Sequence, residues 1–98
     1  MLLFEWDTDK AKINLETHGI SFDEASTVFG DSLSLVIYDP LHSDNEDRFI
    51  LLGNSHRNRL LLIVHTERGN KIRIISARKA TKREREQYEK NAKRPKHA

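Results

Sequence analysis

The sequence contains no cysteine, so neither disulfide bonds nor thiolate ligands for a metal ion are available to it. Nothing in its composition marks a secreted, cross-linked scaffold. It also has no apolar stretch long enough to be a membrane span or the core of a signal peptide. We therefore expect a cytoplasmic protein that does not associate with a membrane.

Sequence motifs for several kinds of catalysis are missing as well. The chain has no glycine-rich phosphate-binding loop, no nucleophile elbow and no Cys/His pair. The close pairs of potential metal ligands are His65 with Glu67 and His42 with Asp44, and neither is a recognised zinc set. Because zinc sites typically need three or four convergent ligands, we expect no bound metal and no cofactor.

The charges that are present are divided unevenly along the chain. Up to Ala77, eight Lys and Arg oppose twelve Asp and Glu, which gives −4, whereas from Arg78 onward nine oppose three, which gives +6. Clustered Lys and Arg release counterions when they meet a polyanion. The basic end therefore suits a phosphate-rich partner or an acidic protein, although a solvated helix with a frayed end would show the same pattern.

Hydrophobic patterning predicts one α+β domain over residues 1–90, one layer of sheet with helices, followed by a basic, disordered tail at 91–98. The first strand is expected at 2–6. A helix should run from an N-cap at Asp7 to Gly19, and a second from a Ser21–Glu24 capping box to about Phe29. Further strands are expected at 33–38, 48–53 and 60–68, the last of them central, with an exposed loop at 42–45 and a last helix beginning near 82.

The dipeptide Gly69-Asn70 is a two-residue hairpin signal that fixes the pairing of the strands on either side of it. It pairs Arg68 with Lys71 and, further along, His65 with Ile74. Regular alternation then puts His65, Glu67 and Arg78 on one face and Arg73 on the other. Both arginines reach one substrate only if a β-bulge or a strand end near 76–78 redirects one of them.

The side chains of Arg73, Arg78, His65 and Glu67 are of the types that can bind and cleave a phosphodiester. RNA can be cleaved without a cofactor when a base removes the proton of the 2′-hydroxyl and cations stabilise the phosphorane that forms. We expect Arg73 and Arg78 to bind the phosphate, with His65 and Glu67 as the candidates for proton transfer.

Each of these residues also has a purely structural interpretation. Arg73 suits a surface position on an edge strand, and Arg78 suits an ion pair with Glu84 at the start of the last helix. His65, inside an apolar strand, suits a packing role in the core. Glu67 suits a cross-strand pair with Arg48 or Lys71.

Four blocks of sequence form a combination found in a known family. They are Phe4-Glu5-Trp6-Asp7 with Lys10 and Asn14; His18-Gly19-Ile20-Ser21-Phe22-Asp23-Glu24-Ala25; Glu46-Asp47-Arg48-Phe49 with Gly53; and Ile72-Arg73-Ile74-Ile75-Ser76-Ala77-Arg78-Lys79-Ala80 followed by Glu84 and Tyr88. On these residues the chain resembles the BrnT family of toxins from bacterial type II toxin–antitoxin systems. Thr8 stands where the family often has proline, and Thr17 stands where it commonly has lysine.

The resemblance implies a RelE-like fold, in which an antiparallel β-sheet is flanked by N-terminal helices and a C-terminal helix. It implies a metal-independent ribonuclease that inhibits translation and growth until a BrnA-like antitoxin binds, usually in a heterotetramer that represses its own promoter DNA through the antitoxin. The residues in the matching blocks that we expect to contact RNA are Arg48, Lys79, Lys10 and His18. The alternative is a non-catalytic module that binds nucleic acid or a partner only within a repressor complex.

Overall fold

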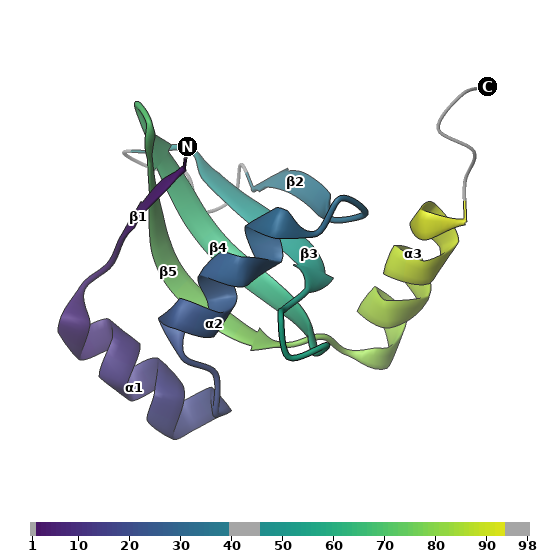
Figure 1. Cartoon of the computed structure of the whole chain (residues 1–98), viewed down its shortest axis with the longest axis horizontal. Helices are drawn as coiled ribbons and strands as arrows, with labels where there is room; N and C mark the ends of the chain where they lie inside the picture. The colour runs from purple at the N-terminus through teal and green to yellow at the C-terminus, as the bar shows by residue number, and fades with distance from the viewer. Residues whose placement is uncertain (1, 40–45, 94–98) are drawn as a thin grey trace.

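Five strands form a single sheet in the order β1-β5-β4-β3-β2 (Figure 1). The computed structural model describes residues 2–39 and 46–93, so the loop expected at 42–45 lies outside the described residues. The strands are β1 (Leu3–Glu5), β2 (Leu35–Asp39), β3 (Arg48–Asn54), β4 (Leu60–Arg68) and β5 (Lys71–Lys79). The helices are α1 (Thr8–His18), α2 (Phe22–Thr27), the 3₁₀ helix η1 (Val28–Gly30) and α3 (Lys82–Ala92).

The expected α+β class is confirmed, and β4 is the central strand as predicted. The expectation of a wholly antiparallel sheet needs a correction, because β1 pairs with β5 in parallel while β2 to β5 pair antiparallel. No hairpin links β1 to β5, so no turn in the sequence sets its direction. The sheet is therefore mixed.

Short polar signals set the ends of the helices. The Asp7 side chain accepts hydrogen bonds from the N–H groups of Asp9 and Lys10, and Gly19 closes α1 in the left-handed conformation. Ser21 caps α2 through the N–H of Glu24 at 3.0 Å. The predicted capping box is only half formed there, because the Glu24 side chain turns to the β3–β4 turn instead of its own helix end.

The α3 helix begins as predicted and extends further than predicted. Thr81 and Glu84 exchange both hydrogen bonds of a capping box. The helix continues through Ala92, two residues into the segment expected to be a disordered tail, and residues 94–98 lie outside the described part. No helix in the described part of the chain is long and apolar enough to span a membrane.

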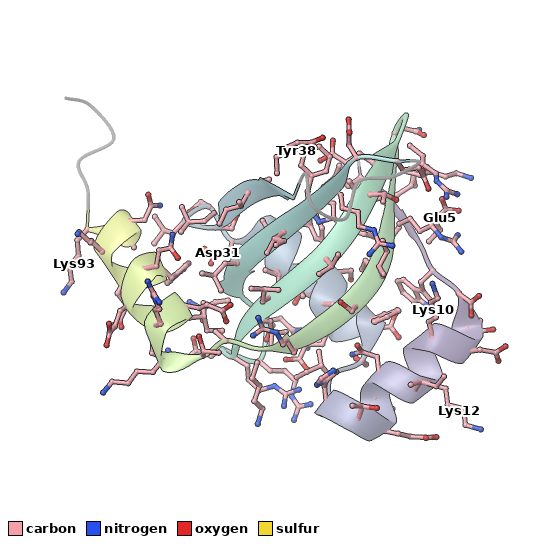
Figure 2. The ribbon with its side chains drawn as sticks, turned by 180° about the vertical axis from the view of Figure 1, so that it is seen from behind. Glu5, Lys10, Lys12, Asp31, Tyr38 and Lys93 are labelled. Atoms are coloured by element: carbon pink, nitrogen blue, oxygen red, sulfur yellow. The ribbon has the colours of Figure 1, made fainter. Side chains whose placement is uncertain are left out.

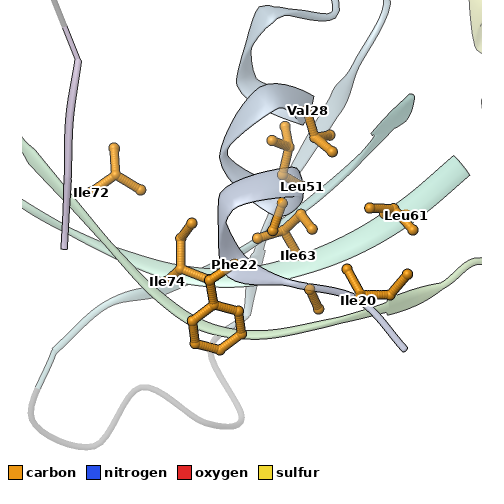
Figure 3. Packing of buried hydrophobic residues seen from close by; sticks show 10 residues of the cluster. Ile20, Phe22, Val28, Leu51, Leu61, Ile63, Ile72 and Ile74 are labelled. Atoms are coloured by element: carbon orange, nitrogen blue, oxygen red, sulfur yellow. The ribbon is translucent and has the colours of Figure 1, made fainter. Parts of the chain in front are cut away.

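The main core lies between one face of the sheet and the helices α1 and α2. Phe22 and Ile20 at the start of α2 pack against the strands, and the cluster is nearly inaccessible to solvent (Figure 3). Its members are Ile20, Phe22, Ala25, Val28, Leu51, Leu61, Ile63, Ile72, Ile74 and Ala77. Tyr88 of α3 packs against Leu52 and Leu60 in a second, smaller cluster on the other face.

Two buried polar networks fasten the helices to the sheet. Glu24 is 3% exposed and accepts hydrogen bonds from Arg59 and from the Ser55 hydroxyl, which joins α2 to the β3–β4 turn. The bond from Arg59 is the main cause that lowers the pKa of Glu24 to about 2. On the other face, the Tyr88 hydroxyl donates to Asp31 at 2.6 Å, which fixes α3 to the loop after η1.

Candidate functional site on the open face of the sheet

The β4–β5 hairpin has the predicted register near its turn and an irregularity further along. Arg68 pairs with Lys71 and His65 pairs with Ile74, as expected, but Val64 pairs with Ser76, so that Ile75 has no opposite residue. This bulge reverses the alternation of β5 beyond it. The faces assigned to Ser76 and Arg78 from regular alternation are therefore wrong.

The bulge brings Arg73 and Arg78 to the same face of the sheet. Arg73 lies opposite Thr66 and Arg78 lies opposite Leu62, and these two partners are four residues apart on β4. We call this the open face, because α1 and α2 pack on the other side (Figure 2). The helix α3 covers one end of the open face through Tyr88.

At the end of the open face that Tyr88 does not cover, four residues form a row across four strands. Arg48 of β3 lies opposite Thr66, Thr66 lies opposite Arg73, and Arg73 lies beside Glu5 of β1. Neighbouring strands are about 4.8 Å apart, so the backbones of the two arginines are roughly 10 Å apart with Thr66 between them. We call Arg48, Thr66, Arg73 and Glu5 the cross-sheet row.

Carboxylates lie close to the arginines of this face. Arg73 Nη1 is 3.9 Å from Glu5 Oε2, and Arg68 donates two hydrogen bonds of 2.6 Å to Glu46. The bonds from Arg68 lower the pKa of Glu46, and the charges of Arg73 and Arg48 lower it further. Three guanidinium groups therefore act on a single carboxylate, which indicates that their positive charge converges there.

Thr66, in the middle of the row, is buried without a hydrogen-bond partner. The residue is 2% exposed, and within the described residues its Oγ1 makes no hydrogen bond. A buried hydroxyl without a partner is uncommon in proteins and costs free energy. Thr66 lies between the two strand positions that carry Arg48 and Arg73.

Arg78 is engaged in an ion pair on the same face. Its Nη1 and Nη2 donate to the two carboxylate oxygens of Glu84 at 2.9 Å each, and these bonds are the main cause that lowers the pKa of Glu84 to about 2. Arg78 also lies roughly 15 Å from Arg73 along β5, at about 3.3 Å per residue. Its structural interpretation, a clamp on the start of α3, is the arrangement present.

His65 and Glu67 lie on the opposite face from the arginines. His65 is 1% exposed, and its ring is 4.9 Å from that of Phe29 and 5.7 Å from that of Phe49. Burial lowers its pKa, against the opposing charge of Glu67, whose Oε2 is 3.6 Å from His65 Nε2. The sheet thus separates both proton-transfer candidates from Arg73, and the predicted set of four does not assemble.

The remaining predicted RNA contacts, Lys10, His18 and Lys79, lie outside the cross-sheet row. Lys10 lies in the first turn of α1; its N–H is the main cause that lowers the pKa of Asp7, and the charges of Lys10 and Arg73 lower that pKa further. His18 lies at the other end of α1. Lys79 is exposed at the end of β5, beyond Arg78. Figure 2 shows Glu5 and Lys10 along the side of the sheet where β1 and α1 run.

The site residues predicted from the sequence do not include Glu5, Thr66, Arg68 or Glu46. The hairpin register put Thr66 opposite Arg73, which was a usable signal. Glu5 reaches the row only through the parallel pairing of β1 with β5, which no local pattern predicts. Over the described ranges, no group of three or more His, Asp or Glu residues is arranged to hold a metal ion.

Comparison with known proteins agrees with this architecture. The sequence model of a family described as "Ribonuclease toxin, BrnT, of type II toxin-antitoxin system" matches residues 6–84. Among solved structures, the 1.1 Å crystal structure of the Brucella abortus ribonuclease toxin BrnT has the same fold, with a TM-score of 0.62 and 19% sequence identity. The likeness covers 84% of this chain and 100% of that chain. No curated protein matches the sequence.

Proposed function

The chain belongs to the BrnT family of ribonuclease toxins from type II toxin–antitoxin systems, and from this premise we propose that it cleaves RNA at the cross-sheet row without a metal ion. The observation that carries the proposal is the row itself. It places Arg48 and Arg73 on either side of the unpartnered Thr66 hydroxyl and a carboxylate, Glu5, beside Arg73.

The arginines supply the charge that a phosphodiester needs as it reacts. Within the described residues the Arg73 guanidinium donates no hydrogen bond, and the Glu5 oxygen beside it is 3.9 Å away, beyond hydrogen-bond length. Its donors can therefore turn to two phosphate oxygens without breaking a strong bond. Arg48 acts on the same phosphate from the other side of Thr66. The Thr66 hydroxyl donates a further hydrogen bond to an oxygen of that phosphate.

Glu5 is the carboxylate that we assign to proton removal. Glu46 is less available for this role, because both of its carboxylate oxygens already accept hydrogen bonds from Arg68. Glu5 accepts the proton of the 2′-hydroxyl, the 2′-oxygen attacks the phosphorus, and the bond to the 5′-oxygen breaks. The 5′-oxygen takes a proton from solvent, which leaves a 2′,3′-cyclic phosphate and a 5′-hydroxyl end. His65 and Glu67 have no part in this step, because the sheet lies between them and the phosphate.

In the cell, this cleavage would inhibit translation and growth until an antitoxin binds. We propose a BrnA-like antitoxin as that partner, in a heterotetramer that represses promoter DNA through the antitoxin. Support comes from the charge of the toxin, since an acidic antitoxin segment and RNA would compete for the same arginines of the open face. Such a toxin would act in the cytoplasm, where its RNA substrates are.

A second candidate is a binding module without catalysis. The ion pair of Arg78 with Glu84 and the burial of His65 favour it, because two of the four predicted catalytic side chains have structural roles. Growth separates the two candidates. Expression of the toxin alone in a bacterial host should arrest growth, and co-expression of the antitoxin should restore it, whereas the binding module leaves growth unchanged.

The direct test is RNA cleavage by the purified protein in EDTA. Arg73→Ala should lower the rate by about 100-fold or more, the typical loss when one preorganised donor to a transition state is removed. Arg83→Ala is the matched control, because Arg83 is an exposed arginine on α3 and lies away from the row. This variant should cleave RNA at the wild-type rate. Equal rates for wild type and Arg73→Ala would contradict the proposal.

A further inference from the structure

We propose that the groove between α1 and β5 binds one nucleobase of the RNA, next to the phosphate held by the cross-sheet row. The inference rests on the proposed function and deepens it, because it gives the RNA a second point of attachment. The groove has a volume of about 260 Å³. It is lined by Lys10, Ile13, Asn14, Thr17, His18, Ile75 and Ser76.

The groove is formed by the bulge in β5 and by the fixed position of α1. β1 ends at Glu5, so β5 has no strand neighbour on that side beyond Arg73. Asn14 takes the place of a strand there, because its side chain donates to the carbonyl of Ala77 at 2.9 Å and accepts from the N–H of Ala77 at 3.1 Å. The side-chain amide of Asn14 also donates a hydrogen bond to the carbonyl of Ile20. The floor of the groove is thus preformed.

The lining combines an apolar surface with polar ends. Ile13 is 59% exposed although it lies on a helix that packs against the sheet, and Ile75 is the unpaired residue of the bulge. Single-stranded RNA presents unstacked bases, which stack on rings such as that of histidine, and His18 belongs to the same lining as the two isoleucines. Lys10 lies near the start of α1, so its positive charge is available to a phosphate next to a base held in the groove.

The size and place of the groove limit what it can hold. Its volume is below the range of about 300–1,000 Å³ that is usual for sites of drug-sized ligands, which fits a single base. Ser76 lies opposite Val64 and so belongs to the open face, three residues beyond Arg73. At about 3.3 Å per residue this is roughly 10 Å, a distance that one nucleotide of an extended strand can bridge. The base would therefore belong to a nucleotide adjacent to the cleaved bond.

Two exposed apolar residues of α1 provide a matched pair for the test. Ile13 lines the groove, whereas Leu15, 50% exposed, lines a separate hollow beside Trp6 and Phe22. The probe is a short RNA with 2′-O-methyl groups, which cannot be cleaved, and binding is measured by fluorescence anisotropy. Ile13→Ala should weaken binding about tenfold, the usual loss for a shortened apolar contact, while Leu15→Ala should bind as the wild type does.

A second arm uses the same RNA with abasic sugars at the positions next to the cleaved bond. Wild type and Ile13→Ala should bind this abasic RNA equally, because only the base contact differs between them. Wild-type affinity of Ile13→Ala for the complete RNA, or an equal loss on both RNAs, would overturn the base site and leave the proposed ribonuclease standing. Failure of the wild type to bind either RNA would instead refute the proposed function, and the base site with it.

Discussion

Thr66 and His65 are the two residues in the described part of the chain that have a buried side-chain polar atom without a hydrogen-bond partner, and Thr66 is the one on the open face. Its hydroxyl is buried with no partner among the described residues, while Arg48 and Arg73 occupy the strands on either side. A polar group left in this state lowers the stability of the folded chain. Such a cost is understandable if the hydroxyl acts on a phosphate during the reaction.

Thr66→Val separates these two roles, because it removes the hydroxyl and keeps the shape of the side chain. The free energy of unfolding should stay the same or rise by about 1 kcal/mol, since an unsatisfied group is removed. The rate of RNA cleavage should fall by about tenfold, the effect of one lost hydrogen bond to the reacting group. Urea unfolding and a cleavage assay measure the two quantities. A variant that is less stable but cleaves normally would mean that the hydroxyl is structural.

Among the secondary-structure elements, α2 depends on one buried carboxylate. Hydrogen bonds from Arg59 lower the pKa of Glu24 from 4.5 to about 2 in the folded chain. The ionised form therefore stabilises the fold fully above pH 4.5, and this contribution disappears as the pH falls toward 2. At neutral pH its size is roughly 3 kcal/mol.

Glu24→Gln should remove this contribution and flatten the acid limb of the stability curve. Urea unfolding between pH 3 and pH 7 measures the free energy of unfolding of both proteins. The difference in this free energy between variant and wild type should be smaller at pH 3 than at pH 7. Glu16→Gln, at an exposed position of α1, is the control and should match the wild type throughout. The role of Glu24 would be disproved by a constant difference across this pH range.

The helix α3 is held at its start by Arg78 and further along by Tyr88. Arg78→Ala breaks the paired hydrogen bonds to Glu84 and should cost about 1–3 kcal/mol locally. Amide hydrogen exchange over residues 82–92 should become faster, while RNA cleavage at the cross-sheet row falls less than in Arg73→Ala. Unchanged exchange combined with a loss as large as that of Arg73→Ala would put Arg78 back among the phosphate ligands.

For each helix and strand, the sequence predicts the features that residues close together in the chain determine, such as helix caps and tight turns. The Gly69-Asn70 turn fixed the register of His65 with Ile74, and the caps at Asp7 and Thr81 marked the helix starts. A β-bulge or strand end near 76–78 is the feature that the sequence required for both arginines to reach one substrate, and the structure has a bulge at Ile75, two residues before the Ala77 backbone that Asn14 contacts. One unpaired residue exchanged the faces of Ser76 and Arg78, and so changed the composition of the site.

In the molecule as a whole, the two faces of the sheet differ in what they carry. One face packs against α1 and α2 and contains His65 in its core. The other carries Arg48, Arg73 and Arg78, and within the described residues α3 packs on one end of it. The choice of Arg73 and Arg48 as site residues stays a prediction from the sequence, whereas only the assembled sheet shows that Glu5 lies beside Arg73.

Two glutamates on opposite faces of the sheet allow the most direct test of this account. Glu5 lies beside Arg73 on the open face, and Glu67 lies beside His65 on the helical face. The measurement is the rate of RNA cleavage in EDTA by Glu5→Gln and Glu67→Gln. We predict that Glu5→Gln loses about 100-fold or more in rate, the usual range for general base catalysis, while Glu67→Gln cleaves as the wild type does. The opposite result would place the reaction at His65 and contradict the account.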